Sequence, residues 1–246
     1  MEQNIFTPEQ SLKIVDTVLS GHNDYLNLRI DMKNKMAVST GFAWTKANFI
    51  DDAFSKGKES GTLDFIQGVE LAKAGESWEY LEFQSSNGLG KSLLIVKNLV
   101  RLKQAFEKRS SRKQSQYLLD YAEKSKNYIK QNIGKIEGFV EQISFDFAPN
   151  EAKRSAEIQE DEFDNFFVIA YSTDANKQIN EIQIVVLDAE SQTVIPVQNL
   201  TGFIQKSKVE QVSSPILSEF EEAPVDVENL EGFGFLPNKV EGEEIV

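Results

Sequence analysis

Three acidic side chains could form a metal-dependent nuclease site. Restriction-type nucleases hold a divalent cation with one acid and an acid-x-Lys pair on a strand, so that a bound water is activated. Asp64 and the segment Glu82-Phe83-Gln84 are the nearest counterparts, although Gln84 stands where the lysine belongs. Glu79 lies three positions before Glu82, on the opposite face of the same strand. Acids in an amphipathic strand usually form its solvated face, so the nuclease is kept as an alternative.

Gly88-Leu89-Gly90-Lys91-Ser92 ends like a phosphate-binding loop, with Gly-Lys-Ser. The complete loop needs a further glycine five positions before that Gly, so that backbone amides wrap the phosphates. Ser85 occupies this position, and an apolar run typical of a strand follows Ser92. We therefore predict a hairpin turn at Asn87-Gly88 and no nucleotide site.

His22 is the only histidine, and the chain has no cysteine. Histidine-rich and thiolate metal clusters are thereby ruled out, and we expect neither a metal nor another cofactor. His22 follows Gly21 at a predicted helix end, where we expect a structural or solvent-exposed role. Without a clear catalytic group, the sequence favours a protein that is not an enzyme.

The charges of the chain are strongly segregated. The formal net charge is −13, yet residues 91–136 hold twelve lysines and arginines against the three acids Glu107, Asp120 and Glu123. Such a cationic stretch in an acidic chain predicts a basic contact surface.

Two predicted helices with a polar connection carry this basic stretch. In the first helix, Arg101 and Lys108 project from the side opposite the apolar face. In the second helix, three tyrosines lie along one edge of the apolar face, and Lys124 borders them. Cations could follow a phosphate backbone and tyrosines could stack unpaired bases. The alternative is a solvated helix pair whose tyrosines close the core. The candidate nucleic-acid-binding residues are Arg101, Lys108, Arg109, Arg112, Lys113 and Lys124.

The order of predicted elements indicates an α+β fold with a mainly antiparallel sheet. We expect a hairpin of two strands before the basic helices and a meander of three strands after them. Pro196 should lie at an edge or a strand end. The predicted helices are Thr7–Gly21, Thr45–Phe54, Asn98–Lys108 and Gln114–Asn132. The predicted strands are Leu26–Met32 (with a helix as the rival), Leu63–Ile66, Trp78–Phe83, Ser92–Val96, Phe163–Ser172, Ile179–Leu187 and Thr193–Val197.

We expect a single α+β domain over residues 1–205, with an acidic segment near 150–162 as a conceivable sub-boundary. Residues 206–246 contain ten acids, three lysines and three prolines, which predicts a mobile acidic tail. No apolar run is long enough for a membrane span, and no secretory signal is recognised, so we expect a cytoplasmic protein.

Two aromatic patterns carry a family resemblance: Gly41-Phe42-Ala43-Trp44 with Asn48-Phe49-Ile50, and Trp78-Glu79-Tyr80-Leu81-Glu82-Phe83. In these the chain resembles an uncharacterised protein family of Gram-positive bacteria and their mobile elements. The resemblance implies no activity and no site residues. The leading hypothesis is therefore a binding protein for nucleic acid or a nucleic-acid-associated complex, with the nuclease and an acidic DNA-mimic inhibitor as alternatives.

Overall fold

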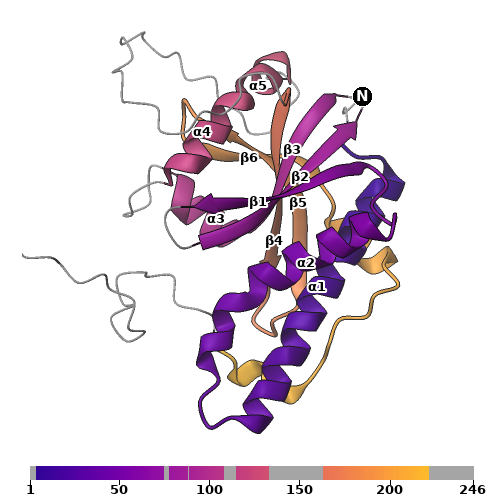
Figure 1. Ribbon diagram of the computed structural model, residues 1–246, viewed down its shortest axis with the longest axis vertical. Coiled ribbons are helices and arrows are strands. Elements are labelled where there is room, and N and C mark those ends of the chain that lie inside the picture. The colour runs from indigo at the N-terminus through magenta and orange to yellow at the C-terminus, as the bar shows by residue number, and fades with distance from the viewer. Residues whose placement is uncertain (1–3, 75–77, 88, 108–114, 133–162, 222–246) are drawn as a thin grey trace, which may run out of the picture.

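One six-stranded sheet with helices on both sides forms the described part of the chain, in an α+β arrangement (Figure 1). The computed structural model describes residues 4–74, 78–87, 89–107, 115–132 and 163–221. The strands lie in sequence order, and all neighbours are antiparallel except β3 and β4. The strands are β1 (Ile66–Ala74), β2 (Trp78–Asn87), β3 (Gly90–Asn98), β4 (Asn165–Thr173), β5 (Ile179–Asp188) and β6 (Thr193–Asn199). The α-helices are α1 (Pro8–Lys35), α2 (Lys46–Glu59), α3 (Leu99–Phe106), α4 (Gln116–Lys124) and α5 (Lys126–Asn132).

Helix α1 begins as predicted but continues through the segment predicted to be a strand. Thr7 and Gln10 form a capping box around Pro8. The strand prediction at Leu26–Met32 is wrong, because Tyr25, Leu26 and Arg29 continue a buried stripe of helical spacing. Gly21 does not end the helix. Its missing side chain instead lets α1 approach α2, since a Cβ there would lie 2.8 Å from the Ile50 Cα atom.

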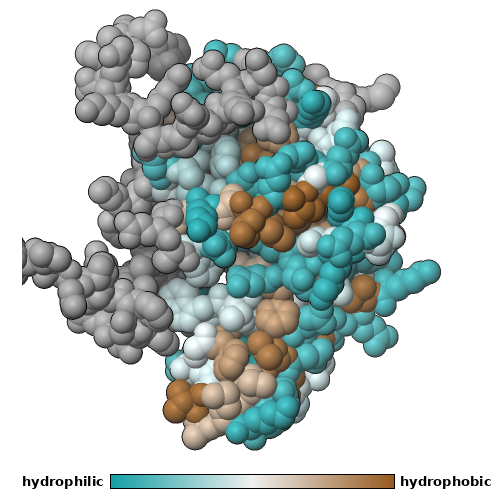
Figure 2. All heavy atoms as spheres, viewed as in Figure 1, coloured by the Kyte–Doolittle hydropathy of each residue, from teal (hydrophilic) through white to brown (hydrophobic). Residues whose placement is uncertain are grey.

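The first strand lies later than predicted. Leu63 and Phe65 are buried in a turn, and β1 starts only at Ile66. Strand β1 is an edge of the sheet, and its residues after Ile66 are partly or fully exposed with little regular alternation of burial. Leu71, for example, is 64% exposed, and Figure 2 shows apolar side chains among hydrophilic ones over this region.

The hairpin and the meander are confirmed. Strands β2 and β3 pair from Phe83–Leu94 to Asn87–Gly90. Strands β4, β5 and β6 form the antiparallel meander, and β6, which carries Pro196, is the other edge strand. Helices α3 to α5 lie in the connection between the parallel strands β3 and β4.

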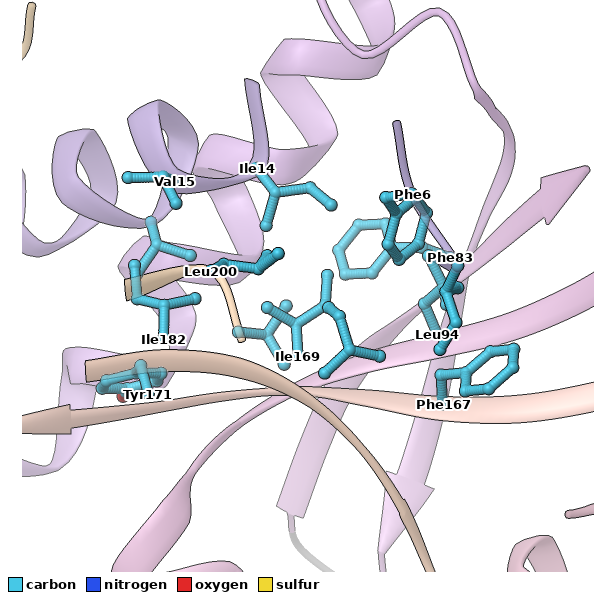
Figure 3. Packing of buried hydrophobic residues seen from close by; sticks show 14 of the residues in the cluster. Phe6, Ile14, Val15, Phe83, Leu94, Phe167, Ile169, Tyr171, Ile182 and Leu200 are labelled. Carbon is cyan, nitrogen blue, oxygen red and sulfur yellow. The ribbon is translucent and has the colours of Figure 1, made fainter. Parts of the chain in front are cut away.

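The two faces of the sheet bury separate clusters of apolar side chains. On one face, α1 and α2 cover residues such as Phe83, Leu94 and Ile182. Figure 3 shows Ile14 and Val15 of α1 on the side of Leu200 and Ile182. On the other face, α3 and α4 cover a cluster that includes Leu93, Ile95, Phe166 and Val168. Helix α5 adds Tyr128 and Ile129 to the first cluster.

Residues 206–221, which composition placed in a mobile tail, are packed along α1 in the structure. Leu217 and Phe220 are buried against Tyr25 and Leu26. The conceivable boundary at 150–162 and the remaining tail residues 222–246 lie outside the described residues. None of the helices in the described ranges is long and apolar enough to cross a membrane.

Candidate functional site

The basic helical segment, α3 to α5, turns the predicted apolar face to the sheet, although Val100 of α3 is exposed. Leu99, Leu102 and Phe106 of α3 are buried, and so are Leu118 and Ala122 of α4. Lys103 and Lys130 are exposed, whereas the other cations are partly buried. The described cations of this segment are Arg101, Lys103, Lys124, Lys126 and Lys130.

Arg101 of α3 lies beside the segment that precedes α2. The Asn98 side chain caps α3 by accepting the Arg101 backbone N–H at 3.1 Å. The Arg101 guanidinium carbon lies 5.8 Å from the ring centroid of Trp44, in the 3₁₀ helix η1 (Thr40–Thr45) that precedes α2. A cation and a partly exposed indole are therefore adjacent on the surface. Lys108, Arg109, Arg112 and Lys113 lie outside the described residues.

Lys124 lies in a different setting from Arg101, beside a polar hollow of about 480 Å³. The neighbouring Lys126 is paired with Glu123 at 2.6 Å, so part of the positive charge of this region is balanced locally. The hollow is lined by Leu89, Glu123, Lys124, Tyr128, Gln131, Phe163, Asp164 and Asn165.

The tyrosines of α4 and α5 point toward the sheet. The ring of Tyr121 stacks on Phe166 at 5.0 Å between centroids, and Tyr128 packs edge-on against Phe167 at 5.1 Å. Tyr117 lies against Tyr80 at 5.4 Å. Of the two sequence-based interpretations, the geometry matches tyrosines that close the core, because these ring faces are occupied by other rings.

A group of polar side chains lies in a seam of the sheet, the place where β2 and β3 separate. The pairing of β2 with β3 stops at Phe83–Leu94, although β2 extends back to Trp78 and β3 forward to Asn98. At this divergence the Asp51 carboxylate, from α2, accepts the Leu81 backbone N–H at 3.0 Å. Asp51 therefore accepts a hydrogen bond from a β2 amide that lies beyond the end of the β2–β3 pairing.

Burial controls the ionisation of this seam. It raises the pKa of Asp51 to about 6, opposed by the Leu81 N–H and by the charge of Lys97. It lowers the pKa of Lys97, opposed by attraction to Asp51 and Glu82. The Lys97 ammonium nitrogen lies 4.3 Å from the ring centroid of Tyr80. Neither charged group was among the predicted site residues, although Asp51 lies beside Ile50 in the buried stripe of α2, which is a signal in the sequence.

The acids of the nuclease alternative are held by separate partners. Asp64 pairs with Lys13 at 3.0 Å, and Glu79 pairs with Lys73 at 3.5 Å across the β1–β2 hairpin. Glu82 accepts hydrogen bonds from the hydroxyls of Tyr80 and Tyr121. No group of three or more acids, histidines or cysteines that could hold a metal occurs in the part of the chain that the structure describes.

The remaining sequence candidates have structural roles. Gly90 has a positive φ of 97° and pairs with Asn87 across the predicted hairpin, and Ser92 is fully buried in β3. A phosphate loop would instead place this serine at the start of a helix. His22 is buried, with its Nε2 atom 2.7 Å from the carbonyl oxygen of Lys177. The histidine thus connects α1 to the β4–β5 turn.

No protein-family model, curated protein or solved structure matches this chain.

Proposed function

We propose that this protein binds nucleic acid, or a nucleic-acid-associated complex, through the basic helical segment and without catalysis. The observation that supports the proposal is the orientation of that segment. Most of its apolar and tyrosine side chains pack inward, whereas Lys103 on α3 and Lys130 on α5 are exposed. Exposed cations attract a polyanion and release the counterions bound to it.

The geometry favours contacts with phosphates over contacts with bases. Tyr117, Tyr121 and Tyr128 pack against other aromatic rings, so they are poor platforms for stacking. Trp44 is the aromatic side chain beside a basic-segment cation, Arg101. Binding should accordingly depend strongly on salt and weakly on base sequence.

The nuclease alternative receives no support from the positions of its acids, which are engaged with Lys13, Lys73 and two tyrosines. An acidic DNA mimic would instead require its carboxylates to form the contact surface. The same binding experiment separates that hypothesis from ours, because a DNA mimic would not bind the labelled nucleic acid.

The test is fluorescence anisotropy with labelled single- and double-stranded DNA and RNA over a salt series, with and without magnesium. The test variant replaces Arg101 and Lys103 on α3 with alanine. The control variant replaces Lys33 on α1 and Lys58 on α2 with alanine; both lysines are exposed and lie on the two helices of the opposite face. Both variants lose two charges, so any difference between them reflects position and not net charge.

We expect wild-type affinity to fall steeply with salt. The α3 variant should bind more weakly, with a salt slope smaller by about one per lost phosphate contact. The control should retain the wild-type affinity. Equal loss in both variants, or no binding at low salt, would contradict the proposal, and magnesium-dependent cleavage would revive the nuclease.

A further inference from the structure

A buried arginine on the opposite face has no acidic partner among the described residues. Arg29 of α1 is only 4% exposed, and no carboxylate among the described residues lies within ion-pair distance of it. One terminal nitrogen, Nη1, donates to the Tyr25 hydroxyl at 2.7 Å, and Nε has no hydrogen-bond acceptor. A buried charge without a counter-charge costs free energy, so it calls for a ligand that supplies one.

Aromatic rings and a second cation surround this guanidinium. Its carbon lies 4.6 Å from the ring centroid of Phe220 and 5.7 Å from that of Tyr25. The Lys46 ammonium lies 5.3 Å from the centroid of the same Tyr25 ring and is itself buried. The rings thus contact the Arg29 guanidinium without supplying an acceptor for its Nε N–H.

Residues 213–221 cover Arg29 and are held in place by apolar packing. The preceding residues, 207–212, are anchored by hydrogen bonds such as those from Ser207 to Asp16 and from Val212 to Asn23. Within residues 213–221, the hydrogen bonds among the described residues are all internal to the segment. Its buried contacts with α1 come from Leu217 and Phe220. Lifting this short segment would therefore break few polar contacts and would expose the Arg29 side chain.

We propose that Arg29 anchors a binding site for a small oxyanion, such as a phosphate or a carboxylate, and that residues 213–221 cover this site. With Nη1 held by Tyr25, the free Nε edge of the guanidinium can offer paired N–H donors to two oxygens of one anion. Since the cover must lift first, the observed affinity is the intrinsic affinity reduced by the fraction of open molecules. The site lies on the face of α1 and does not depend on the proposed nucleic-acid contact.

Isothermal titration calorimetry of the full chain tests this site, with inorganic phosphate and with acetate against chloride at matched ionic strength. The variants are Arg29→Met, Arg29→Lys and Phe220→Ala, with Lys33→Met as the control on the same helix. We expect Phe220→Ala to bind phosphate more tightly than wild type. Arg29→Lys should bind about tenfold more weakly, because lysine cannot present a bidentate fork. Arg29→Met should not bind, and the control should match wild type.

Each result decides the proposal. Saturable phosphate binding that Phe220→Ala strengthens and Arg29→Lys weakens supports it, even if Arg29→Met fails to fold. The acetate titration then tells whether a carboxylate can serve in place of phosphate. The site is refuted if neither wild type nor Phe220→Ala binds either anion, or if Arg29→Lys binds as tightly as wild type. Nucleic-acid binding by Arg29→Lys should equal that of wild type, so the two proposals can fail separately.

Discussion

The Asp51 carboxylate of α2 lies 3.0 Å from the backbone nitrogen of Leu81 and accepts its hydrogen, where β2 has left β3. One helix side chain thereby satisfies an amide of the open seam. The arrangement also buries a carboxylate only partly balanced by Lys97, so it makes stability depend on pH.

Asp51→Asn should stabilise the protein at neutral to alkaline pH. Burial raises the pKa of Asp51 to about 6 from its ordinary value of 3.8, so the folded chain holds this proton more tightly than the unfolded chain. Stability from this group is therefore present at low pH and is lost as pH rises through about 6. This rise in the pKa of Asp51 corresponds to a free energy of about 3 kcal/mol, less the attraction to Lys97 that the variant loses.

Urea unfolding should accordingly show Asp51→Asn more stable than wild type by about 1–3 kcal/mol near pH 8 and by much less near pH 4. Asparagine keeps an acceptor for the Leu81 N–H. Asp52→Asn is the control, because Asp52 is exposed and makes a surface pair with Lys56. An Asp51→Asn protein less stable than wild type at both pH values would contradict this account of the seam.

Tyr121→Phe should destabilise the fold by about 1.5–3 kcal/mol, the usual contribution of a hydrogen bond to a charged group. The Tyr121 hydroxyl donates to the Glu82 carboxylate, which also accepts from Tyr80 at 2.9 Å. Tyr117→Phe is the matched control, since the Tyr117 hydroxyl makes no hydrogen bond to the residues the structure describes, and we expect little change. Equal effects of the two substitutions on the urea midpoint would show that the hydrogen bond from Tyr121 to the Glu82 carboxylate contributes nothing to the stability of the fold.

Gly21→Ala should separate α1 from α2. An added Cβ would lie 2.8 Å from both the Ile50 Cα and the Phe49 carbonyl oxygen, and these backbone atoms cannot move alone. We expect a loss of about 1–3 kcal/mol in thermal or urea unfolding. Gly41→Ala provides the comparison, because a Cβ there would meet nothing within 4 Å. If Gly21→Ala were as stable as Gly41→Ala, the two helices would not pack as closely as described.

Local sequence patterns predicted much of the fold but little of the candidate site. The apolar and aromatic runs of β2 to β6 and the Thr7 cap are signals that span only a few residues, so they could be recognised directly from the sequence. The strand prediction at Leu26–Met32 failed because alternation over seven residues also fits part of a helical stripe, and tertiary packing decided the outcome. Strand β1 was displaced because an edge strand has few buried side chains.

The seam and the Arg29 cluster could not be predicted, because each joins segments distant in sequence. Asp51 meets Leu81 through the docking of α2 on β2, and Arg29 meets Phe220 through the return of the chain along α1. Nothing in the local sequence around either charge indicates its partner. In contrast, the basic helical segment could be recognised from charge counts, because its cations are close together in the chain.

The most direct test of the central claim is lysine labelling with an amine-reactive reagent, with and without bound single-stranded DNA, read by mass spectrometry. Because the claim places nucleic acid on α3 to α5, we predict that DNA protects Lys103 and Lys130 from labelling. Lys33 and Lys58, exposed on α1 and α2, should react equally in both samples. Protection of Lys33 and Lys58 with unchanged labelling of Lys103 and Lys130 would contradict the account.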